Sequence, residues 1–200
     1  HDQPAFHRYG VNVLVSPAPD DPEGAPVLVE SLPTLANLTG RIEYLQQMGA
    51  LVTDVTMIRP GALHRANGGF LVLDAARVLS EPFAWDALKR CLETGEIRII
   101  GANERMGFGT TSTLEPDPVP LDLRVALVGD RLLHMMLDAH DPAFSQLFTV
   151  AAEFGGDMVR DADSVTLFAR LVAGVVRREK LRAVSAGGVA ALVEAASRAA

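Results

Sequence analysis

The sequence predicts an α/β domain that contains a parallel sheet and is followed by a helical segment. Two runs, GFLVLD at residues 69–74 and PLDLRVALVGD at residues 120–130, are apolar almost without interruption. Such runs are typical of strands in a parallel sheet, which helices cover on both faces. Over residues 163–198 the apolar spacing instead follows a helical period. We therefore divide the chain into an α/β part, residues 1–158, and a helical part, residues 159–200.

Further strands are expected where β-branched and aromatic residues cluster between turn signals. They are residues 9–16, 25–30, 41–44, 50–58 and 148–154. The segments RIEY (41–44) and ALVTDVTMI (50–58) are expected to pair as a hairpin across LQQMG. EIRIIG and TSTLEP, which flank the glycine-rich NERMGFGT, predict a second hairpin.

Helices are expected at positions marked by caps and amphipathic spacing. They are residues 60–66, residues 82–94, residues 131–140, the segment from Asp163, and residues 185–198. In the second of these, Phe83, Leu88 and Leu92 form a stripe that should pack against the sheet, and Gly95 ends the helix. Trp85 lies at the edge of the stripe. Two interpretations of it stay open: a partly buried intramolecular position, or a contact with another subunit or domain.

Composition and charge exclude several classes of protein. A net charge of −7 and a pI near 5.2 argue against a dominant nucleic-acid surface, so we expect no nucleic-acid partner. The lone Cys91 cannot form an internal disulfide, which favours a cytoplasmic location. No apolar run approaches the roughly 20 residues needed to cross a bilayer, and no leader opens the chain, so we expect no membrane partner. HExxH and GxSxG are both absent, which argues against a zinc enzyme and a serine hydrolase site.

The end of the run at 69–74 raises the question of nucleotide hydrolysis. An aspartate at the carboxyl end of a strand commonly helps to hold Mg²⁺, and a neighbouring acid polarises water. Asp74 fits the first role, whereas Ala75 cannot fill the second, and GxxxxGK[ST] occurs nowhere in the sequence. The alternative is that Asp74 only caps the helix that begins at Ala75. Arg41 and Arg65, beside turns, either meet a phosphate or acidic partner or pair locally.

Five segments together carry a resemblance to a known family. They are RYGVNVLV, LPTLANLTGRIEY, GALVTDVTMIRPGALHRANGGFLVLDAARVL, EPFAWDALKRCLETGEIRI and LEPDPVPLDLRVALVGD. In order and spacing they resemble the AAA+ part of a Lon-like ATP-dependent protease of the divergent branch related to Lon B. The resemblance implies a three-layer AAA+ type α/β sheet domain with hairpin insertions, followed by the start of a helical lid.

The resemblance also implies an activity for the intact parent protein. Such a parent is a homo-hexameric serine endopeptidase that uses ATP and Mg²⁺ to unfold protein substrates and feed them to Ser-Lys dyads. Its phosphate loop would lie before residue 1 and its protease domain after residue 200. We therefore expect no catalytic residue in this chain, and we expect the isolated chain to hydrolyse neither ATP nor peptides.

Carried over residue by residue, the resemblance places three departures at functional positions. Asp74 corresponds to the metal and nucleotide position, and Ala75 replaces the catalytic glutamate. Gly129 or Asp130 stands where many relatives have a polar asparagine, which makes Asp130 a second candidate for nucleotide binding. Leu147 stands where an arginine finger is common. Two functions stay open: a nucleotide-responsive module of an active protease, and a non-hydrolysing scaffold that assembles the hexamer and gates substrates.

The hairpin RIEYLQQMGALVTDVTMI is expected to supply a substrate contact in the central pore. In AAA+ unfoldases the segment between the phosphate loop and the metal-binding strand provides a pore loop, and this hairpin occupies that interval. Leu45, Met48 and Leu51 can contact varied side chains without sequence specificity, and Tyr44 adds an aromatic ring near the base. The alternative is that these residues cover the sheet or a neighbouring subunit.

Overall fold

The computed structural model describes residues 10–16, 24–47, 50–99 and 114–199. The chain forms two compact units, His1–Val150 and Ala151–Ala200, which are described one at a time. Residues 148–160 form no helix or strand. The predicted division of the chain near residue 158 therefore stays a prediction.

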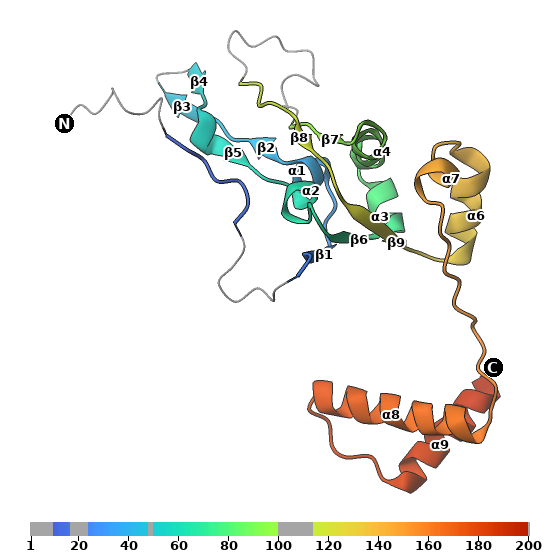
Figure 1. The fold of residues 1–200 in the computed structure, drawn as a ribbon. Helices are drawn as coiled ribbons and strands as arrows, with labels where there is room; N and C mark the ends of the chain where they lie inside the picture. The colour runs from blue at the N-terminus through green and yellow to red at the C-terminus, as the bar shows by residue number, and fades with distance from the viewer. Residues whose placement is uncertain (1–9, 17–23, 48–49, 100–113, 200) are drawn as a thin grey trace. The chain divides into compact units, whose positions relative to one another are not determined.

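Three parallel strands form the main sheet of the first unit (Figure 1). The central strand is β6 (Phe70–Asp74), which pairs with β1 (Val27–Glu30) on one side and with β9 (Arg124–Val128) on the other. The three strands predicted in these regions are confirmed, and so is the α/β fold class. Because all three strands run in the same direction, Asp74 lies at the carboxyl edge of the sheet.

Four helices pack against one face of this sheet and enclose the core. They are α1 (Leu35–Thr39), α2 (Ala62–Arg65), α3 (Ala75–Ser80) and α4 (Ala84–Thr94). Leu71 and Leu73 of β6 point toward these helices and are buried together with Leu88 and Cys91 of α4. α4 ends at Gly95, whose φ of 66° is a left-handed conformation that glycine adopts readily. The helix predicted over residues 82–94 is therefore confirmed.

The other face of the sheet differs from the prediction. Val27, Val29 and Phe70 are 68%, 69% and 47% exposed. In the described part of the chain these side chains lack the cover that a parallel sheet ordinarily has on both faces. The packing predicted for Phe83 is also wrong: with a φ of 63° at the start of α4, its side chain is 68% exposed.

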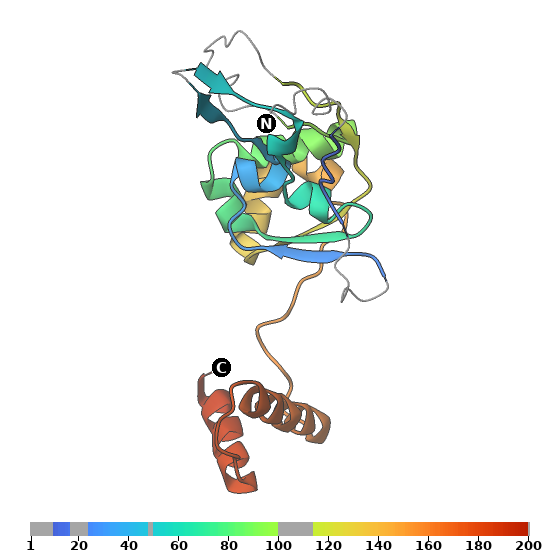
Figure 2. The same cartoon turned by 90° about the vertical axis from the view of Figure 1, so that its left-hand side faces the viewer.

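The insertion between α1 and α2 is a hairpin, as predicted, but residues 45–47, predicted as turn, form a strand, and residues 55–57, predicted as strand, form a 3₁₀ turn. At its base, β2 (Arg41–Ile42) pairs antiparallel with β5 (Ile58–Arg59). Farther out, β3 (Leu45–Gln47) pairs antiparallel with β4 (Ala50–Val52), and a 3₁₀ turn, η2 (Val55–Met57), leads back. Figures 1 and 2 show that β3 and β4 extend away from the helices of the core.

The strand predicted over residues 9–16 is absent from the described residues 10–16. Val11 and Val13 are 84% and 68% exposed, and the segment has no neighbouring strand with which to pair. It is held by a side chain instead. The Asn12 amide donates hydrogen bonds to the carbonyl oxygens of Val55 and Ile58, at 2.9 and 3.1 Å.

The strand predicted over residues 148–154 is also absent. Phe148 stacks on Trp85 with ring centroids 6.0 Å apart, whereas Val150 and Phe154 are 87% and 96% exposed. Of the apolar residues that favoured a strand, Phe148 therefore makes an aromatic contact, whereas Val150 and Phe154 face solvent.

The second hairpin forms with a different partner. β7 (Glu96–Ile97) pairs antiparallel with β8 (Val119–Pro120), so EIRIIG contributes a strand as predicted. Residues 114–118 are not in a strand, and the rest of TSTLEP and the glycine-rich tip lie outside the described residues. After β9 come the predicted helix α6 (Arg131–His140) and the short α7 (Phe144–Leu147).

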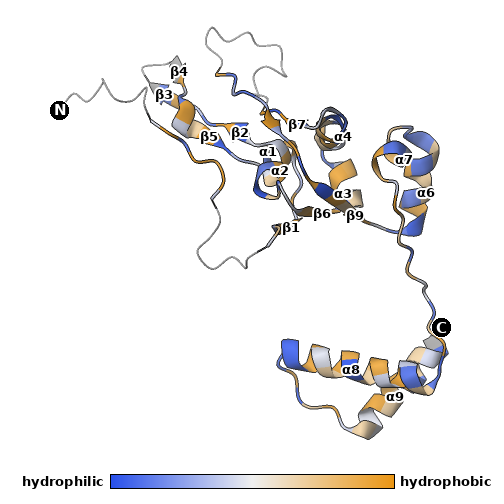
Figure 3. Cartoon of the chain, in the orientation of Figure 1, coloured by the Kyte–Doolittle hydropathy of each residue, from blue (hydrophilic) through white to orange (hydrophobic). Residues whose placement is uncertain are grey.

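The second unit consists of α8 (Ala162–Arg178) and α9 (Ala186–Ala199). The predicted helices are confirmed, with Ser185 accepting a hydrogen bond from Gly188 N at the start of α9. The cap of α8 is Asp161 rather than Asp163, because the Asp161 carboxylate accepts from Ser164 N at 2.8 Å. Figure 3 shows hydrophobic and hydrophilic residues interleaved along α8, as amphipathic spacing requires. Among the described helices, none has the length and apolar character needed to span a bilayer.

Candidate functional site

The carboxyl edge of the sheet brings the two predicted nucleotide-site aspartates to the ends of neighbouring strands. The Asp74 carboxylate accepts a hydrogen bond from Arg77 N at 3.0 Å and caps α3. The Asp130 carboxylate accepts from Leu133 N at 2.7 Å and caps α6. Both aspartates therefore have a structural role at helix N-termini. Their binding of a nucleotide or metal stays a prediction.

Two small residues pack together between these aspartates. Ala75 is 5% exposed, and a Cβ added at Gly129 would lie 3.3 Å from the Ala75 Cβ. At this distance a larger residue at position 129 would press on its neighbour. Ala75 thus occupies the position at which the resemblance implies a glutamate, and Gly129 occupies the position at which it implies a polar residue.

In the part of the chain that the structure describes, the carboxyl edge offers few ligands for a Mg²⁺ ion. Among the described residues, no three His, Cys, Asp or Glu side chains lie together as a metal site. The Asp74 side chain is 51% exposed, and its Oδ2 lies 4.0 Å from the Arg77 Nε. Mg²⁺ commonly binds one or two carboxylates and completes its shell with phosphate and water oxygens. The Asp74 carboxylate is thus compatible with such a Mg²⁺ ion.

A cluster around Trp85 joins α4 to the segment after α6. Trp85 Nε1 and Lys89 Nζ both donate to the Asp141 carboxylate, at 2.7 and 2.8 Å. The Lys89 hydrogen bond lowers the pKa of Asp141, and the same bond raises the pKa of Lys89. Together with the Phe148 stack, these contacts confirm the intramolecular interpretation of Trp85. Leu147, at the position where the resemblance led us to look for an arginine, ends α7 just before Phe148.

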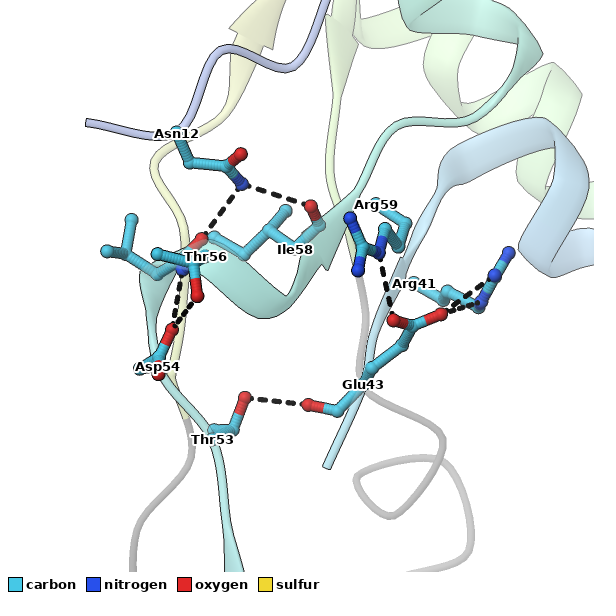
Figure 4. Close-up of polar contacts among 9 residues, drawn as sticks. Asn12, Arg41, Glu43, Thr53, Asp54, Thr56, Ile58 and Arg59 are labelled. Carbon is cyan, nitrogen blue, oxygen red and sulfur yellow. Dashed lines mark hydrogen bonds and ion pairs between the residues drawn. The ribbon is translucent and has the colours of Figure 1, made fainter. Parts of the chain in front are cut away.

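The base of the inserted hairpin carries a charged triad (Figure 4). The Glu43 carboxylate accepts from Arg41 Nη2 and from Arg59 Nε, each at 2.8 Å. The hydrogen bond from Arg59, and to a smaller extent that from Arg41, lowers the pKa of Glu43. Arg65 pairs with Glu30 at 3.0 Å, so local pairing is confirmed for both arginines that the sequence left open. Sequence reasoning missed Glu43, although in the strand predicted over residues 41–44 it would share a face with Arg41, two residues earlier.

The hairpin leaves and rejoins the core where two glycines meet. Gly40 has a φ of 88°, and a Cβ added to it would lie 2.6 Å from the Arg59 carbonyl oxygen. A Cβ on Gly61 would overlap the carbonyl oxygen of Leu38 and the nitrogen of Gly40. Gly61 N donates to Nδ1 of His64, a buried side chain whose pKa burial lowers. The root of the hairpin is thus a backbone crossing that admits no side chain.

The predicted pore residues are described only in part. Tyr44 is partly buried, and its hydroxyl oxygen is buried without a hydrogen-bond partner. Met48 lies outside the described residues, as does the side chain of Leu51. Leu45 and Val52, which face each other across β3 and β4, are 51% and 45% exposed. The hairpin therefore presents two apolar side chains to solvent, Leu45, which the sequence indicated, and Val52, which it did not.

Comparison with known proteins gives the family. Residues 23–155 match the model of the LonB-like AAA domain. A putative Lon protease homolog of Escherichia coli K12 is 30% identical over 151 residues, which are 72% of this chain and 24% of that protein. The chain thus spans about a quarter of that relative. NtrX from Brucella abortus is similar in structure at 20% identity and a TM-score of 0.48, over 84% of this chain and 36% of that one. The predicted relationship to Lon B is confirmed, and this chain belongs to the family of LonB-like AAA domains.

Proposed function

We propose that this chain is the AAA module of a Lon-like ATP-dependent serine protease. In this proposal the module unfolds protein substrates and feeds them to a Ser-Lys proteolytic domain outside the chain, in a cytoplasmic homo-hexamer. The observation that carries the proposal is the inserted hairpin, which extends from the core and exposes Leu45 and Val52. Exposed apolar side chains on a projecting element suit contact with many substrates, since apolar contact requires no particular sequence.

The hairpin is attached to the core by close backbone contacts and by charged side chains. Its root crosses the backbone at Gly40 and Gly61, and its base is fastened by the hydrogen bonds of Glu43 to both strands. A substrate contact at the tip would therefore act on a braced element rather than on a free loop. Tyr44, Met48 and Leu51 remain proposed substrate contacts of the same hairpin.

The test replaces an exposed leucine of the hairpin in the full-length protein. Leu45→Ser should abolish degradation of a folded protein while cleavage of a small peptide and hexamer assembly are retained. Leu192→Ser is the matched control, because Leu192 of α9 is 44% exposed, close to the 51% of Leu45. Unchanged degradation of folded protein by Leu45→Ser would refute the proposed role of the hairpin.

A second candidate is a non-hydrolysing scaffold, which the contact of Ala75 with Gly129 favours. Ala75 has no carboxylate that could polarise water, and Gly129 has no polar side chain. ATP turnover by the full-length protein decides between the two functions. Turnover that Asp74→Ala abolishes would exclude the scaffold, whereas intact hexamers without turnover would exclude the ATP-driven module.

ATP and Mg²⁺ are the proposed cofactors of the full-length protein. Asp74 would hold the Mg²⁺ ion, and Asp130, which caps the neighbouring helix, is the second proposed contact to the nucleotide. The bound metal would neutralise phosphate charge. The protein's own contribution at this edge is to fix the Asp74 carboxylate through the hydrogen bond from Arg77 N.

A further inference from the structure

A hollow of about 510 Å³ lies at the base of the inserted hairpin. Its lining residues are Glu43, Tyr44, Leu45, Thr56, Met57 and Arg59. Leu45, Met57 and the ring of Tyr44 supply apolar walls, and Arg59 supplies a cationic group. A concave site with apolar walls and a few polar groups is the usual form of a ligand site.

The charged residues that line the hollow are Glu43 and Arg59, with Arg41 beside Glu43 and the Asp54 carboxylate hydrogen-bonded to Thr56. Glu43 faces two guanidinium groups, those of Arg41 and Arg59, across hydrogen bonds of 2.8 Å each. Arg41 engages Glu43 with both Nε and Nη2, whereas Arg59 uses only Nε. Within the described part of the chain, the two Nη groups of Arg59 have no hydrogen-bond partner. They form the end of a planar fork that matches two acceptor oxygens.

Glu43 fixes the direction of that fork. Its Oε2 holds the Nε edge of Arg59, which restricts rotation of the long side chain, and its Oε1 is occupied by Arg41. Figure 4 shows the Arg59 guanidinium lying above the Glu43 carboxylate, which follows β2 in the chain. The carboxylate of Glu43 is therefore satisfied, and the unused Nη groups remain for a ligand.

We propose that this hollow binds a carboxylate of an extended peptide, with Arg59 as the anchor and Glu43 as a positioning residue. The apolar walls formed by Leu45 and Met57 accommodate the aliphatic carbons next to the carboxylate. Two sources share this chemistry, an acidic side chain within a substrate and the carboxylate at a chain end. The inference rests on the proposed function, because it assigns a ligand to the hairpin that is proposed to contact substrates.

The test measures binding of four N-acetylated peptides, which differ only at the central residue and the C-terminus, to the full-length protein by isothermal titration calorimetry. The peptides carry a central Glu or Gln, each with a free or an amidated C-terminus. Peptides with a carboxylate should bind about tenfold more tightly than the Gln amide peptide, the factor that one hydrogen bond to a charged group supports. Tight binding only with Glu identifies the side chain as the source, and tight binding only with a free C-terminus identifies the chain end. Equal binding of all four peptides would overturn the inference.

Two variants with the same change in charge separate the site from general electrostatics. Arg59→Gln should remove the tenfold preference, whereas Arg41→Gln should retain it, because Arg41 does not line the hollow. Both arginine side chains are about half exposed, at 52% and 51%, so neither substitution opens the core. Equal loss in the two variants would contradict the proposal.

The outcome is separable from that of the proposed function. Degradation of folded protein by Leu45→Ser reports on whether the hairpin handles substrates. The peptide preference reports only on whether the hollow binds carboxylates. A hairpin that is required for degradation but binds all four peptides equally would sustain the function and reject the site.

Discussion

Replacement of Gly61 by alanine should destabilise the first unit by about 3 kcal/mol, the upper part of the range for overpacking a tight interior. The added Cβ would meet the Leu38 carbonyl oxygen and the Gly40 nitrogen at less than the 3.0 Å that real Cβ atoms keep. Both are backbone atoms, so no side-chain rotation can relieve the overlap. Relief requires that the end of α1 and the root of the hairpin move apart.

Gly95→Ala is the matched control for this prediction. Gly95 adopts a positive φ, 66°, whereas Gly61 has a φ of −93°, and no atom lies within 4 Å of a Cβ added at Gly95. This variant should therefore lose only about 1 kcal/mol, the strain of an alanine in the left-handed region. Gly61→Ala adds overlap without left-handed strain, whereas Gly95→Ala adds left-handed strain without overlap, so a larger loss in Gly61→Ala reports the overlap at the hairpin root.

Urea denaturation of the chain measures both losses. Trp85 is the single tryptophan and contacts the end of the first unit through Asp141, so its fluorescence follows the unfolding of that unit. A shift in midpoint at constant slope reports the change in the free energy of unfolding. If Gly61→Ala is no less stable than Gly95→Ala, the backbone crossing is not tight and the reasoning fails.

The remaining predictions concern titratable and capping groups. The hydrogen bond from Lys89 lowers the pKa of Asp141, so the stability that this carboxylate contributes is complete above 3.8, its usual pKa, and is lost as the pH falls through the lower folded value. Asp141→Asn should remove this acid dependence in urea titrations. Burial lowers the pKa of His64, so the unfolded chain binds a proton more readily than the folded chain, and the free energy of unfolding should fall as the pH drops below 6.5. His64→Gln should not show this fall in the free energy of unfolding. Asp74→Ala removes the cap of α3 and should lower the free energy of unfolding by about 1 kcal/mol, measured by the same denaturation.

Local sequence signals predicted the elements that the core builds on. The continuous apolar run that ends at Asp74 is a central strand, because its buried residues, Leu71 and Leu73, face the helices. Gly95 ends a helix because it adopts a left-handed conformation that other residues avoid. Such signals involve residues close together in the chain, so one sequence suffices to read them.

Features that depend on distant residues could not be predicted in this way. The apolar residues at 11–15 resemble a strand, but no neighbouring strand is present to pair with them. Phe148 belongs to an aromatic cluster because α4 brings Trp85 next to it, which the local pattern does not reveal. At the candidate site, Asp74 and Asp130 were identified from strand ends, whereas the role of Arg59 follows only from the pairing of β2 with β5.

The opposition of Arg41 and Arg59 across β2 and β5 has a consequence for strand alignment. Two like charges directly opposite each other in a sheet repel, and Glu43 removes the repulsion by accepting a hydrogen bond from each. Because side chains alternate between faces, a slip of β5 by one residue would carry Arg59 to the face away from Glu43. The charges at the base of the hairpin therefore disfavour a one-residue slip of β5 against β2.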